Sequence, residues 1–172
     1  MNKNLTVVIP IYLISEKLVN LTNTCLESVR TYLSDANIIL VDDGSTYLPN
    51  DYINIGAATL VSHGKNLGFA TAVNTGIKSC KTEYILIMGN DLSLLNNEPM
   101  DEAFQLLAQG SDFVKLHDQN GPGLNSPYQG FNCCLSKTSL YTEVGLLDTD
   151  FRQNFEDADF HERLDAHNKV VT

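Results

Sequence analysis

Short apolar runs alternate along the chain with longer segments whose apolar residues recur at helical spacing. Residues 5–10 are rich in β-branched side chains, which is typical of a strand buried on both faces. Within residues 16–33 an apolar residue returns every three or four positions, which predicts a helix. The same two patterns predict strands at residues 37–41, 58–61, 84–88, 112–116 and 131–135, and helices at residues 68–80, 100–108 and about 154–167.

This alternation indicates an α/β fold, in which helices flank a mainly parallel, Rossmann-like sheet. The chain of 172 residues has the length of one domain of about 100–200 residues, and it shows no internal repeat or interdomain linker. We therefore expect residues 1–172 to form a single compact domain. Residues 118–129 are polar and rich in Gly and Pro, and loops of that length are often functional or mobile.

The predicted sheet also predicts where a ligand would bind. In folds of this kind, ligands bind beyond the carboxyl ends of the parallel strands. Polar residues follow three of these ends, at residues 10–12, 42–45 and 89–91. Because these ends meet at one edge of the sheet, we expect the three clusters to converge.

Two segments near this edge have both a structural and a functional interpretation. Asp42 and Asp43 open the sequence Asp-Asp-Gly-Ser-Thr, which forms a good turn by itself, and a turn is the commoner explanation. As strand-end carboxylates they would instead accept hydrogen bonds from a nucleoside. The loop at residues 63–68 leads into a helix, whose first N–H groups can bind phosphate, with Lys65 as the natural side-chain contact. A polar turn explains this loop equally well.

Carboxylates supply the remaining candidate chemistry. Asp91, after the predicted strand 84–88, could hold a divalent cation on a diphosphate, because hard oxygen ligands suit Mg²⁺ and Mn²⁺. One Asp is not a metal site, so other ligands must join it.

The last predicted helix is strongly acidic at its start. Asn154 suits its N-cap, with Asp157 three residues later, and acids in a first turn stabilise a helix. Asp159 and Arg163 are spaced as an i,i+4 ion pair. The functional alternative is a general base among Glu156, Asp157 and Asp159.

Composition narrows the classes of partner. The formal net charge of −10 argues against electrostatic binding of nucleic acid or an anionic membrane. The four cysteines show no CxxC spacing and suit small buried hydrophobes better than disulfides. We see no signal peptide and no apolar run near the roughly 20 residues of a membrane span. A reducing, cytoplasmic compartment is therefore expected.

Taken in order, five segments resemble those of family 2 glycosyltransferases, which have the GT-A fold. They are residues 8–12, 41–46, 66–77, 84–91 and 145–164, and their order and spacing make the resemblance specific over roughly residues 5–170. The chain departs from the family pattern at three positions. Leu13 stands where Asn is frequent, Gly89 replaces the first residue of the DxD or NPD motif, and Asn168 replaces a usual Gly. The resemblance predicts a minimal domain without the C-terminal extension of many relatives.

The resemblance implies an inverting enzyme that moves a sugar from a nucleotide donor, with a UDP-sugar favoured, to a hydroxyl of a glycan, a lipid-linked or another acceptor. It implies Mn²⁺ or Mg²⁺ as cofactor, with Asp91 on the metal side, and Asp157 as the base beside Glu156. It places the donor against the following residues: Pro10, Tyr12, Asp42, Asp43 and Ser45 around the nucleoside, Lys65, Asn66 and Gly68 beside the ribose and diphosphate, and Asn90 next to Asp91.

Two alternatives remain at this point. A non-catalytic module that binds nucleotide sugars would explain Gly89. A sugar nucleotidyltransferase would carry a Gly-rich, basic loop after the first strand, and residues 11–15 contain none. His117 and His161 are candidates for further metal ligands, although ordinary surface or packing roles explain both.

Overall fold

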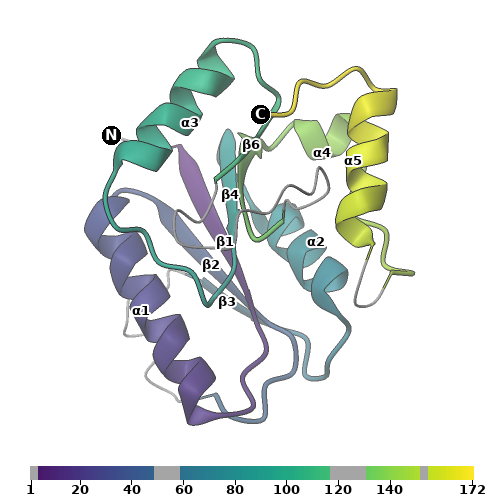
Figure 1. Cartoon of the computed structure of the whole chain (residues 1–172). Coiled ribbons are helices and arrows are strands. Elements are labelled where there is room, and N and C mark those ends of the chain that lie inside the picture. The colour runs from purple at the N-terminus through teal and green to yellow at the C-terminus, as the bar shows by residue number, and fades with distance from the viewer. Residues whose placement is uncertain (1–3, 49–58, 117–130, 152–154) are drawn as a thin grey trace.

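The computed structural model describes residues 4–48, 59–116, 131–151 and 155–172 (Figure 1). The helices and strands in these residues follow one another as β1 (Leu5–Ile11), α1 (Glu16–Tyr32), β2 (Asn37–Asp42), β3 (Thr59–Ser62), α2 (Phe69–Ser79), β4 (Tyr84–Met88), α3 (Glu98–Ala108), β5 (Phe113–Lys115), β6 (Cys133–Lys137), α4 (Leu140–Glu143) and α5 (Glu156–Ala166).

The strands form one six-stranded sheet in the order β3-β2-β1-β4-β6-β5. Strands β1, β2, β3 and β4 all run parallel to one another, and β6 runs antiparallel to both β4 and β5. The sheet is therefore mainly parallel, which confirms the predicted α/β class. The carboxyl ends of β1 to β4 share one edge, as the sequence led us to expect.

Both faces of the sheet are covered by helices, which explains why the central strands are mainly apolar on both faces. Leu5, Val7 and Ile9 of β1 pack into one core with residues of α1 and α3, whereas Val8 packs into the other with residues of α2 and α5. Figure 1 shows the same two layers, with α1 and α3 on one face and α2, α4 and α5 on the other.

The contact between α2 and the central strand is unusually close. A Cβ on Gly76 of α2 would lie 2.2 Å from Cγ1 of Val8, so any larger residue would push the helix off the sheet. Asn74, on the same helix, exchanges two hydrogen bonds with the Leu147 backbone, at 2.8 and 3.0 Å. These contacts tie α2 to the segment between α4 and α5.

The last residues of the chain extend the sheet beyond β5. The Val170 carbonyl accepts from the Asp112 N–H at 2.8 Å, and the Thr172 carbonyl accepts from the Lys115 N–H at 2.8 Å. The Thr172 N–H in turn donates to the Phe113 carbonyl at 3.0 Å. The free side of β5 is thereby paired.

The structure corrects the sequence predictions at several boundaries. Strand β6 begins two residues later than predicted, and α4 is too short to produce a visible period in the sequence. Helix α5 begins at Glu156, and its N-cap position is held by Phe155, in a left-handed conformation with φ 76° and without a side-chain cap. Asp157 is accordingly the second helical residue. The predicted cap Asn154, the start of the third strand at residue 58, the loop 118–129 and His117 lie outside the described residues.

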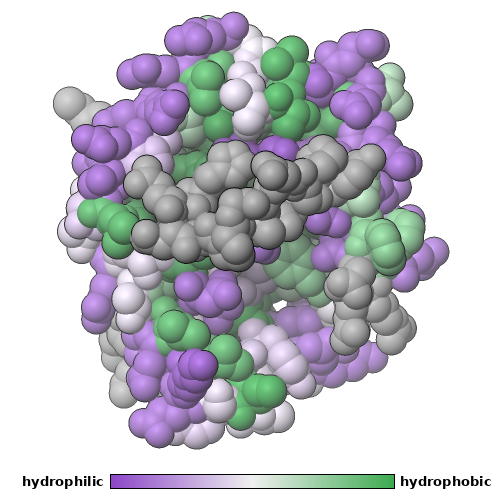
Figure 2. Space-filling model, viewed as in Figure 1, coloured by the Kyte–Doolittle hydropathy of each residue, from purple (hydrophilic) through white to green (hydrophobic). Residues whose placement is uncertain are grey.

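The surface is mixed in character. Figure 2 shows mainly hydrophilic residues on the outer faces of α3 and α5, with hydrophobic residues in smaller groups between them. Among the described helices, none combines the length and apolar character needed to cross a membrane.

Candidate functional site

The loops that follow β1 and β2 are hydrogen-bonded to each other. The Leu13 N–H donates to Ser45 Oγ at 2.7 Å, and the N–H groups of Thr46 and Tyr47 both donate to the Leu13 carbonyl at 3.0 Å. Ser45 thus has a structural partner at this edge. Tyr12 lies in the first loop with 42% of its surface exposed, so its side chain is available to a ligand.

Asp42 ends β2 and is almost completely buried, with 3% of its surface exposed. Its Oδ1 accepts from the Ser45 N–H at 2.8 Å, and its Oδ2 accepts from the Ser62 hydroxyl at 2.9 Å. The carboxylate thereby joins the ends of β2 and β3. Pro10, also buried, pairs with Val41 across the neighbouring strands.

Asp43 is equally buried and holds the loop that precedes α2. Its Oδ1 accepts from His63 Nδ1 at 2.8 Å and from the Leu67 N–H at 2.9 Å, and its Oδ2 accepts from the Gly68 N–H at 2.9 Å. The predicted phosphate loop therefore directs the amides of Leu67 and Gly68 at this carboxylate, not outward. Asp43 therefore supports this edge of the sheet through buried hydrogen bonds.

His63 is a residue that the sequence predictions did not single out. Its imidazole lies between Asp43 and α2, with Nε2 2.9 Å from Oγ1 of Thr75. Since an ionised carboxylate only accepts, Nδ1 must carry a proton. A histidine two residues after the predicted strand 58–61 and 20 residues beyond Asp43 was the available signal, but its partners are distant in sequence.

The loops after β2 and β3 also touch backbone to backbone. Gly44 has φ 81°, and a Cβ there would lie 2.3 Å from the carbonyl carbon of Lys65. Only glycine combines this conformation with such a close approach. The contact leaves the side chains of Lys65 and Asn66 exposed at the edge, where they can meet a ligand.

The loop after β4 carries Gly89, Asn90 and Asp91. The Asn90 side chain donates from Nδ2 to the hydroxyl of Thr22 in α1 at 2.8 Å. Asp91 is exposed, and its Oδ1 lies 2.9 Å from where a Cβ of residue 89 would stand. The carboxylate therefore occupies the space that a side chain at residue 89 would need.

This loop could bind a divalent cation only if a bound ligand supplied part of the cation's coordination shell. The described residues contain no group of three His, Cys, Asp or Glu side chains that could enclose a metal ion. Mg²⁺ commonly takes one or two carboxylates and completes its shell with phosphate oxygens and water. Asp91 is exposed and suits that arrangement, provided that a bound phosphate ligand supplies the other oxygens.

The acids of α5 are arranged differently from one another. Asp159 pairs with Arg163, with Oδ2 2.6 Å from Nη2 and 3.0 Å from Nε, which confirms the predicted i,i+4 pair. Oδ1 of Asp157 accepts from the Ala158 N–H at 2.8 Å. Oε2 of Glu156 is buried and has no hydrogen-bond partner in the part of the chain that the structure describes. Of the three candidate bases, Glu156 and Asp157 therefore have no ionic partner among the described residues, whereas Asp159 has one.

His161 lies one turn after Asp157 and is 6% exposed. Its ring meets that of Phe113 edge-on, with centroids 5.7 Å apart. Burial lowers the pKa of His161 below its usual value, and the positive charge of Lys115 acts in the same direction. The structure therefore favours the neutral imidazole and a packing role.

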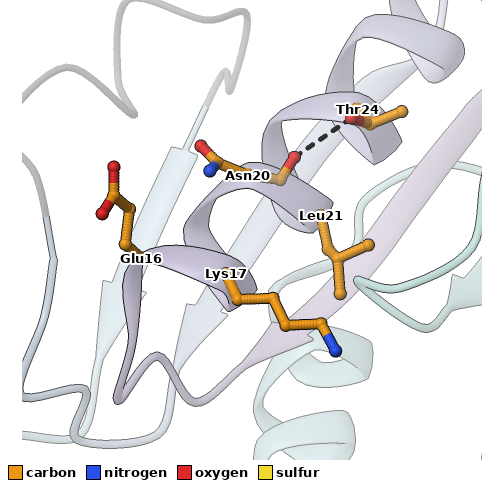
Figure 3. A pocket seen from close by; sticks show the side chains of 5 residues that line it. All are labelled: Glu16, Lys17, Asn20, Leu21 and Thr24. Atoms are coloured by element: carbon orange, nitrogen blue, oxygen red, sulfur yellow. Dashed lines mark hydrogen bonds between the residues drawn. The ribbon is translucent and has the colours of Figure 1, made fainter.

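A hollow of about 390 Å³ lies apart from the predicted site (Figure 3). The described residues that line it all belong to α1 and are Glu16, Lys17, Asn20, Leu21 and Thr24. Figure 3 shows them along one side of the helix, with the Thr24 hydroxyl bonded to the Asn20 carbonyl. None of the predicted donor-binding residues lines it.

All four cysteines are free thiols, and Cys25 and Cys134 are buried as predicted, whereas Cys80 and Cys133 are half-buried. Burial raises the pKa of both Cys25 and Cys133 to about 12, with smaller contributions to Cys25 from Cys133 and Asp91. These two thiols are therefore protonated near neutral pH and unsuited to act as nucleophiles.

The predicted residues thus fall into three groups. Hydrogen bonds join the loops after β1, β2 and β3 into one edge, and the loop with Asn90 and Asp91 is held separately by α1. The acids of α5 form the third group, and within the described ranges no hydrogen bond links them to the loops after β1, β2 and β3 or to the loop after β4.

Comparison with known sequences gives a family match. The family model described as Glycosyl transferase family 2 matches residues 6–113. A stretch of 72 residues is 40% identical to the uncharacterized glycosyltransferase EpsJ of Bacillus subtilis (strain 168). This stretch is 39% of the present chain and 21% of EpsJ, so the similarity covers a small part of that protein.

Solved structures show the same fold at low sequence identity. TarS 1–349 of S. aureus superimposes with a TM-score of 0.77 and 16% identity over 98% of this chain and 58% of that one. The mannosyltransferase PcManGT of Pyrobaculum calidifontis was solved with GDP-Man and Mn²⁺. It superimposes with a TM-score of 0.78 and 18% identity over 98% of this chain and 53% of the PcManGT chain. A complex of TarS 1–349 with UDP-GlcNAc superimposes with a TM-score of 0.75 and 16% identity. These likenesses confirm the GT-A fold, and the chain spans little more than half of each structure.

Proposed function

Because this chain belongs to glycosyl transferase family 2, we propose that it moves a sugar from a nucleotide-diphosphate donor to an acceptor hydroxyl with inversion. A UDP-sugar is the favoured donor, and the acceptor is a glycan, a lipid-linked compound or another hydroxyl compound. The observation that carries the proposal is the family match over residues 6–113, which includes the loops after all four parallel strands.

The donor would bind across the edge formed by these loops. The exposed ring of Tyr12 would stack on the nucleoside base. TarS, which has the same fold, was solved with UDP and with UDP-GlcNAc, which supports a nucleotide at this edge. Pro10, Asp42, Asp43 and Ser45 would shape the nucleoside pocket through the bonds described above, with Gly68 positioned by Asp43. Lys65 and Asn66, both exposed, would lie beside the ribose and diphosphate.

A divalent cation, Mn²⁺ or Mg²⁺, would neutralise charge on the diphosphate when bound, and Asp91 would be its carboxylate ligand. The complex of PcManGT with Mn²⁺ supports this assignment for the fold. Asn90 lies beside Asp91 in the same loop.

The chemical step would use Asp157 as the general base. Its carboxylate would take the proton of the acceptor hydroxyl while the hydroxyl oxygen forms a bond to the anomeric carbon. The bond from that carbon to the diphosphate oxygen would break, and its electron pair would leave with the nucleoside diphosphate. Attack opposite the leaving group inverts the configuration. Glu156, which is half-buried next to Asp157, would help to hold the acceptor beside it.

Two further expectations belong to the proposal. The four free cysteines support a reducing, cytoplasmic setting. The net charge of −10 supports a small-molecule donor over nucleic acid as the partner.

The proposal is tested with a panel of UDP-, GDP- and dTDP-sugars in the presence of Mn²⁺. We expect at least one of them to raise the thermal unfolding temperature and to release its nucleoside diphosphate slowly by hydrolysis or transfer. If no donor shifts the unfolding temperature and none releases nucleotide, the proposal is wrong.

Gly89 favours one alternative, because it removes a carboxylate from the metal-side loop. A non-catalytic module of the same fold would bind a nucleotide sugar without transferring it. Binding without release or transfer to any acceptor, together with unchanged binding in Asp157→Asn, would support this alternative.

A further inference from the structure

Helix α1 holds the loop after β4 through side chains that repeat at every third residue. The Thr22 hydroxyl accepts from Asn90 Nδ2 at 2.8 Å, and the Cys25 thiol points to the Gly89 carbonyl at 3.7 Å. One turn further, the Ser28 hydroxyl accepts from the Leu94 N–H at 3.0 Å. Thr22, Cys25 and Ser28 are all buried, so the loop is anchored from inside the protein.

The bonds of Thr22 determine how the Asn90 amide is turned. The Thr22 hydroxyl donates its one proton to the Leu18 carbonyl at 2.8 Å. It can therefore only accept from Asn90, so the NH₂ group of the amide must face Thr22. Oδ1 of Asn90 is left on the other side of the amide, and no described residue donates a hydrogen bond to it.

The same loop lacks its usual first acid. Gly89 carries no side chain, and the Asp91 carboxylate folds over it, with Oδ1 2.9 Å from the site of a Cβ. Charge at this position comes from Asp91 alone among the three loop residues. A neutral amide oxygen is a ligand that Mg²⁺ and related hard cations accept.

We propose that Thr22 is a positioning residue, which turns the Asn90 side-chain oxygen so that it serves as a second protein ligand, beside Asp91, for the cation bound with the donor's diphosphate. This inference rests on the proposed function. It assigns to Asn90 the part that a carboxylate at residue 89 would otherwise play, and it assigns to a buried threonine of α1 the orientation of that ligand.

The test compares three substitutions in α1 with one in the loop. Thr22→Val removes the hydroxyl at nearly constant volume, and Thr22→Ser keeps it. Thr24→Val is the matched control, because Thr24 makes the same kind of bond to the carbonyl four residues earlier but is exposed and away from the loop. Asn90→Ala removes the proposed ligand itself without altering the helix.

The measurement is Mn²⁺ binding in the presence of saturating UDP, followed by the electron paramagnetic resonance signal of free Mn²⁺. Thr22→Val and Asn90→Ala are expected to weaken Mn²⁺ binding by about 10–100-fold, the usual effect of losing a ligand's support. Thr22→Ser and Thr24→Val are expected to bind Mn²⁺ as the unchanged chain does. Thermal unfolding of each variant identifies a loss of fold, and Asn90→Ala decides the question if Thr22→Val does not fold.

The outcomes separate this inference from the proposed function. If the unchanged chain does not bind Mn²⁺ with UDP or with the other nucleotides of the donor panel, the proposed function itself is in doubt. If it binds, but Asn90→Ala and Thr22→Val bind equally well, only the present inference is overturned. It is also overturned if Asn90→Ala weakens the binding of a UDP-sugar but not of Mn²⁺ with UDP, since Oδ1 would then bind the sugar.

Discussion

The imidazole of His63 and the carboxylate of Asp43 lie 2.8 Å apart, and the same ring reaches Thr75 of α2 at 2.9 Å. This pair links the end of β2 to the helix that follows the donor-side loop. Replacing His63 by Ala should lower the free energy of unfolding by about 1–3 kcal/mol, because buried polar groups lose a partner. It should also weaken binding of the nucleotide that gives the largest response in the donor panel.

Denaturant unfolding and nucleotide titration measure both effects. His167→Ala is the control, because His167 is exposed and, among the described residues, its Nδ1 is hydrogen-bonded only to the Arg163 carbonyl of the preceding helical turn, 2.8 Å away. Equal losses in the two variants would show that His63 has no special role at this edge.

Gly44 and Gly64 have similar backbone angles, with φ 81° and 70°, but different surroundings. A side chain at either position costs about 1–2 kcal/mol of backbone strain. At Gly44 it would also collide with the Lys65 backbone, whereas nothing lies within 4 Å of the corresponding position on Gly64. Gly44→Ala should therefore lower Tm clearly more than Gly64→Ala, as thermal unfolding would show. Similar shifts would mean that the two loops are not packed as described.

The general-base assignment is tested at two neighbouring acids. Asp157→Asn should lower turnover by about 10²–10⁴-fold while leaving donor binding largely unchanged. Asp159 is paired with Arg163, so Asp159→Asn should act mainly on stability. Steady-state rates and donor titrations of both variants test this assignment. A greater loss of turnover in Asp159→Asn than in Asp157→Asn would show that Asp157 is not the base.

Asp91 leads to a prediction about linked binding. Because the loop offers only part of a metal's ligand shell, nucleotide and metal should each raise the affinity of the protein for the other by the same factor. Nucleotide binding should be weak in EDTA and strengthened by Mn²⁺, and Asp91→Ala should lose the strengthening. Calorimetric titration with and without Mn²⁺ measures this, and equal affinity in EDTA would contradict it.

His161 should make stability depend on pH. Its pKa is lowered in the folded state, chiefly by burial and also by Lys115, while Asp157 and Asp165 oppose the shift. When the pH falls through about 6.5, the unfolded chain takes up a proton that the folded chain resists, so stability declines. Urea unfolding between pH 8 and pH 5 should show a smaller decline in His161→Leu than in the unchanged chain. An identical decline would exclude His161 as a source.

Much of the fold follows from patterns within short stretches of sequence. The runs that form β1, β2 and β4 are apolar on both faces, and α1 has a clear period and a Ser15 cap that accepts from the Leu18 N–H. The start of α5 was harder to predict, because a left-handed Phe155 holds a position where Asn154 had the better side chain. Helix α4 has four residues, which is little more than one helical turn.

The site was less predictable, because its bonds join residues far apart in sequence. The motif residues Asp42 and Asp43 were found from the sequence, but not that both would be buried and used to hold neighbouring loops. His63 and Thr22 have no motif of their own. The roles of these two residues depend on which helix and strand lie next to them, and only the folded structure shows these neighbours.

The pairing of the last residues with β5 has a consequence for how this protein behaves in concentrated solution. The carbonyls of Val170 and Thr172 accept from the amides of Asp112 and Lys115 along the outer side of β5. A chain cut before Lys169 would leave that side unpaired, and an unpaired strand is a template for strands of other molecules. Such a truncated chain should self-associate and aggregate, even with its proposed donor site intact.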